Sequence, residues 1–330
     1  MHRSAKRIAL ALALAGWPLL VPAAQGAAPV KTITFLTNYV FNGRHAPFFV
    51  GLEKGFYQEA GFAIEIKPAT GSGFVITAVD GGKADYGMAD VSSVAQGVLK
   101  GAKVKGFMVY TDTTTNGLAG LAPHPTPASV VGKKIAASQT DSVRVILPII
   151  FDAHKLDASA LNWQAADPSV YSSLLFSGQV DLLTATSDGD LPALTKIAAP
   201  QGKTVYFSAF ADWGYDVFGY VLLGSSAALA KDADEARRFA EASKKSVRYA
   251  IDNPEETAQI MVKHNPTMNR DTVAAQWAET IKSMQTPYVA QHGYGAATED
   301  RIARSIALVK KALKLDGDLK PADIYLSIGQ

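Results

Sequence analysis

The chain has 330 residues, with 32 lysines and arginines against 30 aspartates and glutamates, and it contains no cysteine. This length predicts about two domains, and the near-balanced charge without a basic stripe argues against nucleic acid as a partner. The lack of cysteine excludes disulfides, thiolate metal sites and cysteine nucleophiles.

Residues 1–28 have the pattern of a secretory signal peptide. A basic start with Arg3, Lys6 and Arg7 precedes the apolar run 8–20, and small residues follow between 23 and 28. The apolar run is short for a bilayer span, so a membrane anchor is the less favoured alternative. Because no cysteine is present for lipid attachment, we expect an exported protein that is free in the periplasm.

Strand and helix patterns alternate after the signal, which predicts an α/β fold with mostly parallel strands. We expect strands at 32–37, 62–67, 84–88, 104–111, 133–137, 160–165, 180–185, 203–208 and 217–223. We expect helices at 46–59, 73–81, 91–100, 142–155, 169–177, 190–198, 232–252, 254–264, 270–284 and 299–314. The last third of the chain is therefore helical.

The domain organisation is indicated by a proline-rich segment. Three prolines in Leu121–Pro127 indicate a connector, and a new strand–helix series runs from 132 to about 210. We expect residues 119–216 to form a second lobe, inserted into a first lobe of residues 29–118 and 217–330. Two chain crossings make a hinge, and ligands bind where two lobes close over them.

Two strand–turn–helix units near the N-terminus place polar turns at one edge of the first lobe. Arg44 and His45 lie in the first turn, and Gly71, Ser72 and Gly73 form the second. Helix N-termini present unpaired N–H groups, so this edge is suited to a polar or anionic small molecule. A capping role for His45 and a mere tight turn at the glycines are the alternatives.

Two aromatic side chains flank the first of these turns. Tyr39 and Phe41 could stack on a planar ligand or could belong to the core. In the second lobe, an equivalent polar turn follows the strand at 133–137. Its candidate ligand contacts are Ser138, Thr140, Asp141 and Ser142.

Five segments carry a family resemblance. They are HAPFFVGLEKGFYQEAGFAIEIKPATGSG at 45–73, GGKADYGMAD at 81–90, VGKKIAASQTDS at 131–142, LLFSGQVDLLTATSDG at 174–189 and YAIDNPEETAQIM at 249–261. In this order they resemble periplasmic solute-binding proteins of the nitrate/sulfonate/taurine and thiamine-pyrimidine-precursor family of ABC importers.

The resemblance implies a type II periplasmic-binding-protein fold, with two α/β lobes, a two-stranded hinge and a helical C-terminal region. It also implies a monomer without cofactor, metal or catalysis, which delivers a small-molecule solute to a permease in the inner membrane. It does not identify the solute, because members of the family take very different ones.

The resemblance places further residues in the cleft. Asp90 and Ser92 follow a strand whose end lines the cleft in relatives, although Asp90 could be an ordinary helix cap. Asp188 is the expected acidic ligand contact, and Asp190 is expected to cap a helix. Trp213 and Tyr215, beside a glycine near the hinge, could form a stacking wall or pack between the lobes.

Two classes of function follow from these observations. The first is a solute-binding protein, and the alternative is a thiamine-pyrimidine-synthase-like enzyme on the same fold. The enzyme chemistry of such relatives uses a histidine and a cysteine-rich, iron-binding segment, whereas this chain has His45 but no cysteine. His264 and His292 show no metal-ligand spacing, so no metal is expected.

The class of solute is left between two alternatives. The helix starts with Arg44, His45 and Arg144 favour an anion such as a sulfonate or carboxylate. The aromatic candidates with Asp188 favour a nitrogen-bearing ring. We expect a small planar organic solute.

Overall fold

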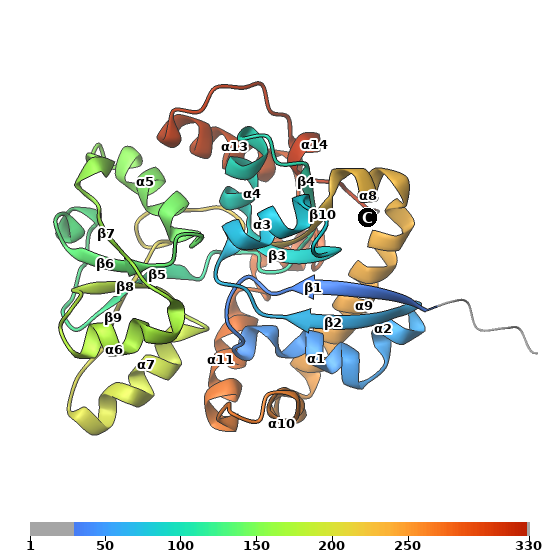
Figure 1. Cartoon of the computed structure of the whole chain (residues 1–330), viewed down its shortest axis with the longest axis horizontal. Coiled ribbons are helices and arrows are strands. Elements are labelled where there is room, and N and C mark those ends of the chain that lie inside the picture. The colour runs from blue at the N-terminus through green and yellow to red at the C-terminus, as the bar shows by residue number, and fades with distance from the viewer. Residues whose placement is uncertain (1–29, 329–330) are drawn as a thin grey trace, which may run out of the picture.

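The computed structural model describes residues 30–328, and the expected signal peptide lies outside them. The strands form two separate five-stranded sheets, each flanked by helices (Figure 1). Sheet A contains β1 (Lys31–Leu36), β2 (Phe62–Lys67), β3 (Tyr86–Asp90), β4 (Val104–Val109) and β10 (Tyr220–Ser225). Sheet B contains β5 (Asn116–Gly120), β6 (Lys134–Ala137), β7 (Asn162–Ala165), β8 (Leu182–Thr186) and β9 (Tyr206–Ala209). The predicted α/β class is confirmed.

The helices divide between the sheets. Sheet A carries α1 (Ala46–Glu53), α2 (Phe56–Glu59), α3 (Ser72–Asp80), α4 (Val91–Leu99), α8 (Ser226–Lys231), α9 (Ala233–Asp252), α10 (Pro254–His264), α11 (Arg270–Lys282), α12 (Pro287–His292), α13 (Glu299–Leu313) and α14 (Pro321–Ile324). Sheet B carries α5 (Val143–Ala153), α6 (Tyr171–Phe176) and α7 (Asp190–Ala198). We call sheet A with its helices lobe 1, and sheet B with its helices lobe 2. No described helix is both long and apolar enough to cross a membrane.

Sheet A is mixed, with the strand order β2-β1-β3-β10-β4. Strand β1 pairs in parallel with β2 and β3, whereas β10 is antiparallel to β3 and β4. The apolar stripe of α9 covers this sheet: the Phe239 ring lies 5.7 Å from Phe35, 4.8 Å from Tyr86 and 5.2 Å from Tyr57. Burial of these rings fixes the first lobe's core.

Sheet B has the order β7-β6-β8-β5-β9, and its strand β5 is absent from the sequence-based prediction. The segment NGLAG has two glycines and no β-branched residue, so its composition does not indicate a strand. Glycine is needed there because a Cβ on Gly117 would lie 2.5 Å from the Phe207 ring and the Ser208 carbonyl oxygen. Pairing with β8 and β9 makes this segment a strand.

Other boundaries also differ from the prediction. The expected helix at 46–59 is divided into α1 and α2 at Gly55, whose φ of 72° lies in the left-handed region. Short helices α8, α12 and α14 and several 3-10 turns, among them η1 (Gly43–His45), are additional.

The chain crosses between the sheets twice, at residues 110–115 and 210–219. The crossings contact each other, since the Gly219 N–H donates to the Thr111 carbonyl at 3.0 Å and the Tyr220 N–H donates to Thr111 Oγ1 at 2.8 Å. The expected boundary between residues 118 and 119 falls inside β5, and the division at 29–118, 119–216 and 217–330 stays a prediction.

The lobes share an apolar core beside these crossings. Helix α13 of lobe 1 packs against both α4 and α5, and α5 belongs to lobe 2. Ile306 and Val309 of α13 belong to the same buried cluster as Ile146 and Ile150 of α5. On this side the two lobes are therefore held by hydrophobic contact.

Candidate functional site

A small polar cavity lies between the two lobes, and both lobes supply its walls. Its lining residues are Asn38, Tyr39, Arg44, Gly71, Ser72, Asn116, Asp141, Ser142, Val143, Thr184, Ala185, Thr186, Asp190 and Tyr220. The cavity volume of about 20 Å³ is close to the minimum that holds one water molecule. A solute with the size of an aromatic ring therefore requires the lobes or their side chains to move apart.

One edge of this cavity is formed by a direct backbone contact between the lobes. The Gly73 N–H of lobe 1 donates to the Thr140 carbonyl of lobe 2 at 3.0 Å, and Ser138 Oγ donates to the Thr70 carbonyl at 2.6 Å. A Cβ on Gly71 would lie 2.2 Å from the Thr140 carbonyl oxygen, so only glycine permits this approach.

A larger groove lies on the other side of this contact. Its volume is about 610 Å³, and α3, α4 and the start of α5 supply most of its lining. Gly73, Thr140 and Asp141 lie in its wall. The Gly71–Thr140 contact therefore separates an inner cavity from an outer groove in the same cleft.

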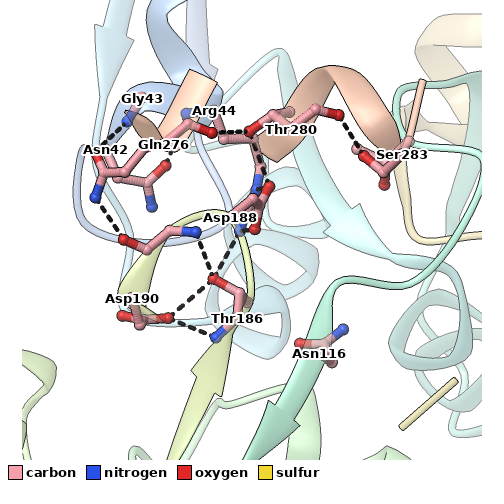
Figure 2. Close-up of polar contacts among 12 residues, drawn as sticks. Asn42, Gly43, Arg44, Asn116, Thr186, Asp188, Asp190, Gln276, Thr280 and Ser283 are labelled. Carbon is pink, nitrogen blue, oxygen red and sulfur yellow. Dashed lines mark hydrogen bonds and ion pairs between the residues drawn. The ribbon is translucent and has the colours of Figure 1, made fainter. Parts of the chain in front are cut away.

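A buried ion pair joins the lobes on the opposite wall (Figure 2). Arg44, in the middle of η1 in lobe 1, is 1% exposed, and Asp188, after β8 in lobe 2, is fully buried. Arg44 Nε donates to Asp188 Oδ2 at 2.8 Å, Nη2 donates to Asp188 Oδ1, and Thr280 Oγ1 of α11 donates to Asp188 Oδ2 at 3.0 Å. Burial acts to raise the pKa of Asp188, but the Arg44 guanidinium beside it holds that pKa below its ordinary value.

This pairing gives Asp188 a partner within the protein. Both carboxylate oxygens accept hydrogen bonds from Arg44, and the residue does not line the cavity, so its expected contact with solute stays a prediction. Gln276 of α11 strengthens the same junction, because it accepts from the Gly43 N–H at 2.8 Å and donates to the Gly189 carbonyl. Asp188 and its loop thus join the lobes.

Three further carboxyl groups gather at the cavity without a cationic partner among residues 30–328. Burial raises the pKa of Asp90 to about 7, although the Ser92 and Ser93 N–H groups donate to its Oδ1. Burial likewise raises the pKa of Asp190 to about 6, although Thr186 donates to its Oδ2 through N–H and Oγ1 at 2.8 and 2.9 Å.

Asp141 is the third carboxyl group, and burial raises its pKa as well. Its Oδ2 accepts from Thr184 Oγ1 at 2.6 Å, and its Oδ1 accepts from the Val143 N–H at 2.9 Å. The proximity of Asp141 contributes to the raised pKa of Asp90. The cavity is therefore an acidic one.

His45 lies behind the cavity wall and is fully buried. Its Nδ1 accepts from the Asn42 N–H at 3.2 Å, so the proton is on Nε2, which donates to Asn38 Oδ1 at 3.0 Å. Burial and the neighbouring Arg44 hold the pKa of His45 well below its ordinary value. The ring is a neutral support for Asn38, which lines the cavity.

The predicted site residues thus fall into two groups. Those that line the cavity are Tyr39, Arg44, Gly71, Ser72, Asp141 and Ser142. Those that do not line it are Phe41, His45, Gly73, Asp90, Ser92, Ser138, Thr140, Asp188, Trp213 and Tyr215. Solute contact by any of them stays a prediction.

Three of the residues that do not line the cavity make packing contacts or hydrogen bonds within the protein. The Trp213 ring packs 5.5 Å from Phe210, and its Nε1 donates to the Pro125 carbonyl at 3.2 Å. The Tyr215 hydroxyl pairs with Ser92 Oγ, and Phe41 lies edge-on to Phe49 at 5.2 Å. These side chains hold the crossing and the first turn in place.

Sequence reasoning missed eight lining residues, namely Asn38, Asn116, Val143, Thr184, Ala185, Thr186, Asp190 and Tyr220. Asn116 was missed because β5, which it begins, was missed. Asp190 was expected to cap a helix, but its carboxylate accepts from Thr186 and not from the first turn of α7. Within residues 30–328, no group of three or more histidine or acidic side chains is arranged to hold a metal ion.

Comparison with known proteins identifies the architecture. The NMT1/THI5-like family model matches residues 42–257, more than half of the chain. No curated protein matches the sequence.

Solved structures match over nearly the whole chain at low identity. The alkanesulfonate-binding protein of Xanthomonas axonopodis pv. citri bound to MOPS is 12% identical, with a TM-score of 0.69 over 91% of this chain and 100% of that one. The ligand-binding component of an ABC-type import system from Staphylococcus aureus, with zinc bound, is 13% identical, with a TM-score of 0.65 over 90% and 97%. The periplasmic nitrate-binding protein of Synechocystis PCC 6803 is 13% identical, with a TM-score of 0.61 over 91% and 92%. The family match and the shared fold show that this chain belongs to the NMT1/THI5-like family and has the type II periplasmic-binding-protein fold.

Proposed function

We propose that the protein is the solute-binding component of an ABC-type importer and captures a small planar organic solute by closure of its two lobes. The observation that carries the proposal is the origin of the cavity walls. Tyr39, Arg44 and Ser72 come from lobe 1, whereas Asp141, Thr184 and Asp190 come from lobe 2. A site divided in this way is complete only when the lobes meet, so binding and closure are coupled.

Two features support a planar solute. Tyr39 and Tyr220 line the cavity, and the Arg44 guanidinium lies 4.6 Å from the centre of the Tyr220 ring. Flat groups of this kind favour a flat ligand. Partnership with a membrane permease is supported by family membership, by the ABC-type import system of one structural neighbour and by the signal-peptide pattern.

The enzyme alternative has less support. The sequence contains no cysteine for an iron-binding segment. The one histidine beside the cavity, His45, is buried and neutral, and both of its ring nitrogens are engaged within lobe 1. A general base must reach the proton that it removes, and His45 does not line the cavity.

A thermal-shift screen of the chain from residue 29 onward tests the proposal. The compounds are sulfonates, aromatic carboxylates, pyrimidines, amines and nitrate, and a binder raises the melting temperature by mass action. Small-angle scattering with a binder should show a smaller radius of gyration than without it. A screen without any binder, or conversion of a pyrimidine into a product, would overturn the proposal.

A further inference from the structure

The charges around the cavity bear on the class of solute. Among the described residues that line it, Arg44 has the one cationic side chain. Its Nε and Nη2 both donate to Asp188, and Nη2 also donates to Thr186 Oγ1 at 2.9 Å, so its charge is already balanced by a buried carboxylate. Arg144, the other arginine near the cleft, lies in the outer groove and donates to the carbonyls of Ser138 and Ala137 at 2.6 and 3.1 Å.

The acidic groups, in contrast, are in excess. Asp141 and Asp190 line the cavity. Asp90 does not line it but lies behind the lining residue Asn116, whose Nδ2 donates to Asp90 Oδ2 at 3.4 Å. None of the three takes part in an ion pair within residues 30–328. The charged groups that influence their pKa values are Arg144 for Asp141, Arg44 with Asp188 for Asp190, and Asp141 for Asp90.

The hydrogen bonds of the wall also leave acceptors free. The Thr184 hydroxyl donates to Asp141 and the Thr186 hydroxyl donates to Asp190, so neither hydroxyl proton is available to a solute. Asp190 Oδ1 receives no hydrogen bond from residues 30–328, and each oxygen of Asp141 receives one where a carboxylate oxygen accepts two. Among the donors left in the wall, the Asn38 amide and the Tyr39 hydroxyl are neutral, whereas Arg44 Nη1, which has no acceptor among residues 30–328, belongs to the guanidinium that is paired with Asp188.

We infer that the solute carries a cationic group rich in N–H donors, such as an ammonium, amidinium or guanidinium, and that Asp141 and Asp190 receive it, with Asp90 adding negative potential from behind. This inference rests on the proposed function and names the charge class of its ligand. An anion in the cavity would face two carboxyl groups and a guanidinium that is already paired. A cation satisfies the free oxygens and allows the carboxyl groups to ionise.

Matched pairs of planar probes with opposite charge test the inference. Acetamidinium is compared with acetate, and benzamidinium with benzoate, by calorimetry and thermal shift at constant ionic strength. At pH 8 we expect at least one amidinium to bind with a dissociation constant of about 1 mM or tighter, and neither carboxylate to bind. Binding displaces protons from the carboxyl groups, so we expect at least about tenfold weaker amidinium binding at pH 5.5.

Asparagine variants identify the residues involved. Asp190→Asn and Asp141→Asn each keep one oxygen acceptor, so the hydrogen bonds donated by Thr186 to residue 190 and by the Val143 N–H to residue 141 are retained. Each should weaken amidinium binding about tenfold or more, the cost of one lost charge-assisted hydrogen bond. Asp212→Asn is the matched control on an exposed residue and should change nothing.

The outcomes separate this inference from the proposed function. Binding of benzoate or acetate, strengthened at pH 5.5 or by Asp190→Asn, overturns the cationic class and leaves a solute-binding protein. Failure of both amidiniums to bind also overturns the inference, whereas the proposed function is then judged by the wider screen and by scattering. Equal loss of binding in Asp212→Asn would remove Asp141 and Asp190 from the proposed role.

Discussion

Arg44 and Asp188 lie 144 residues apart in the sequence and in different lobes, yet they form a two-point ion pair from which water is excluded. Removing two charges from water is costly, and the geometry of the pair offsets this cost only while both partners are present. Thr280 Oγ1 donates to the same carboxylate, so Asp188 has three hydrogen bonds. The pair therefore contributes mainly to the correct docking of the Asp188 loop onto lobe 1.

The first prediction concerns the loss of one partner. Asp188→Asn removes the negative charge and leaves the Arg44 guanidinium buried without a counter-ion. We expect the free energy of unfolding to fall by about 3–5 kcal/mol, measured by urea denaturation. Combining Asp188→Leu with Arg44→Met should cost less than the sum of the single changes, since no unpaired charge is left.

The exposed pair of Arg304 and Asp216 is the matched control. Its side chains are 53% and 73% exposed, and their N–O distance is 2.8 Å. Asp216→Asn should change the free energy of unfolding by about 1 kcal/mol or less. Equal effects of Asp188→Asn and Asp216→Asn would show that burial does not determine the strength of the interlobe pair.

The second prediction concerns the approach of Gly71 to Thr140. Gly71→Ala places a Cβ 2.2 Å from the Thr140 carbonyl oxygen, so the lobes cannot adopt this contact without a shift of the backbone. We expect a larger radius of gyration in solution and loss of the thermal shift that a binder produces. The Gly73–Thr140 hydrogen bond would be lost at the same time.

Gly82→Ala is the control that distinguishes an effect on lobe closure from an effect of backbone strain. Gly82 also has a positive φ, of 68°, but a Cβ there meets nothing within 4 Å. Both substitutions should therefore destabilise the folded chain through strain, whereas only Gly71→Ala should affect closure. Retained binding in Gly71→Ala would show that the contact is not needed for the bound form.

The third prediction is the pH dependence of stability. The pKa values of Asp90 and Asp190 are raised to about 7 and about 6, whereas an aspartate in an unfolded chain has a pKa of about 3.9. The folded protein therefore holds protons that the unfolded chain has released. The corresponding stability is fully present below pH 4 or so and is lost as the pH rises through 6 and 7, by at most about 1.4 kcal/mol per pH unit for each group.

Urea denaturation at several pH values between 4.5 and 7.5 measures this slope. Asp90→Asn should make it shallower, because the variant has one group fewer that titrates in this range. Asp188 does not alter this slope. Because its pKa is lowered in the folded protein, its contribution to the free energy of unfolding is lost only at more acidic pH. An unchanged slope in Asp90→Asn would mean that Asp90 is ionised in the folded protein throughout this range.

The fourth prediction separates Trp213 from the binding site. Its side chain is 6% exposed and packs on Phe210 in the second crossing. Trp213→Ala should lower the free energy of unfolding by about 3–5 kcal/mol through the cavity that it leaves. The thermal shift produced by a binder should be retained. Loss of this shift in a variant of normal stability would show that Trp213 contributes to solute binding.

Much of the fold was predictable because local patterns and tertiary structure agree. Strand β2 alternates buried and exposed residues, and α10 begins at Pro254 with acidic residues in its first turn, as expected for a helix start. Strand β5 was not predictable, because Gly117 is required by the Phe207 ring and Gly120 by the Leu182 side chain, both on neighbouring strands and not nearby in the sequence. Such a requirement is visible only in the folded chain.

The segments that form the candidate site were predictable from the sequence, whereas the hydrogen bonds and ion pairs between their side chains were not. The polar turns after β2 and β6 do meet, as the glycine-rich and serine-rich sequences indicated. The pairing of Asp188 with Arg44, however, could not be predicted, because the two residues lie 144 positions apart in the sequence. The half-buried carboxylate of Asp190 is likewise held by Thr186, a contact that the helix-capping interpretation of the sequence did not predict.

The antiparallel strand β10 has a consequence for the evolution of such proteins. It lies between β3 and β4, so the chain leaves sheet A at β4 and re-enters at its neighbour β10. The two attachment points of lobe 2 are therefore adjacent, and a short turn could replace the whole insertion without disturbing the order of sheet A. Lobe 2, which carries Asp141 and Asp190, could therefore be exchanged between relatives while the strand order of lobe 1 is kept.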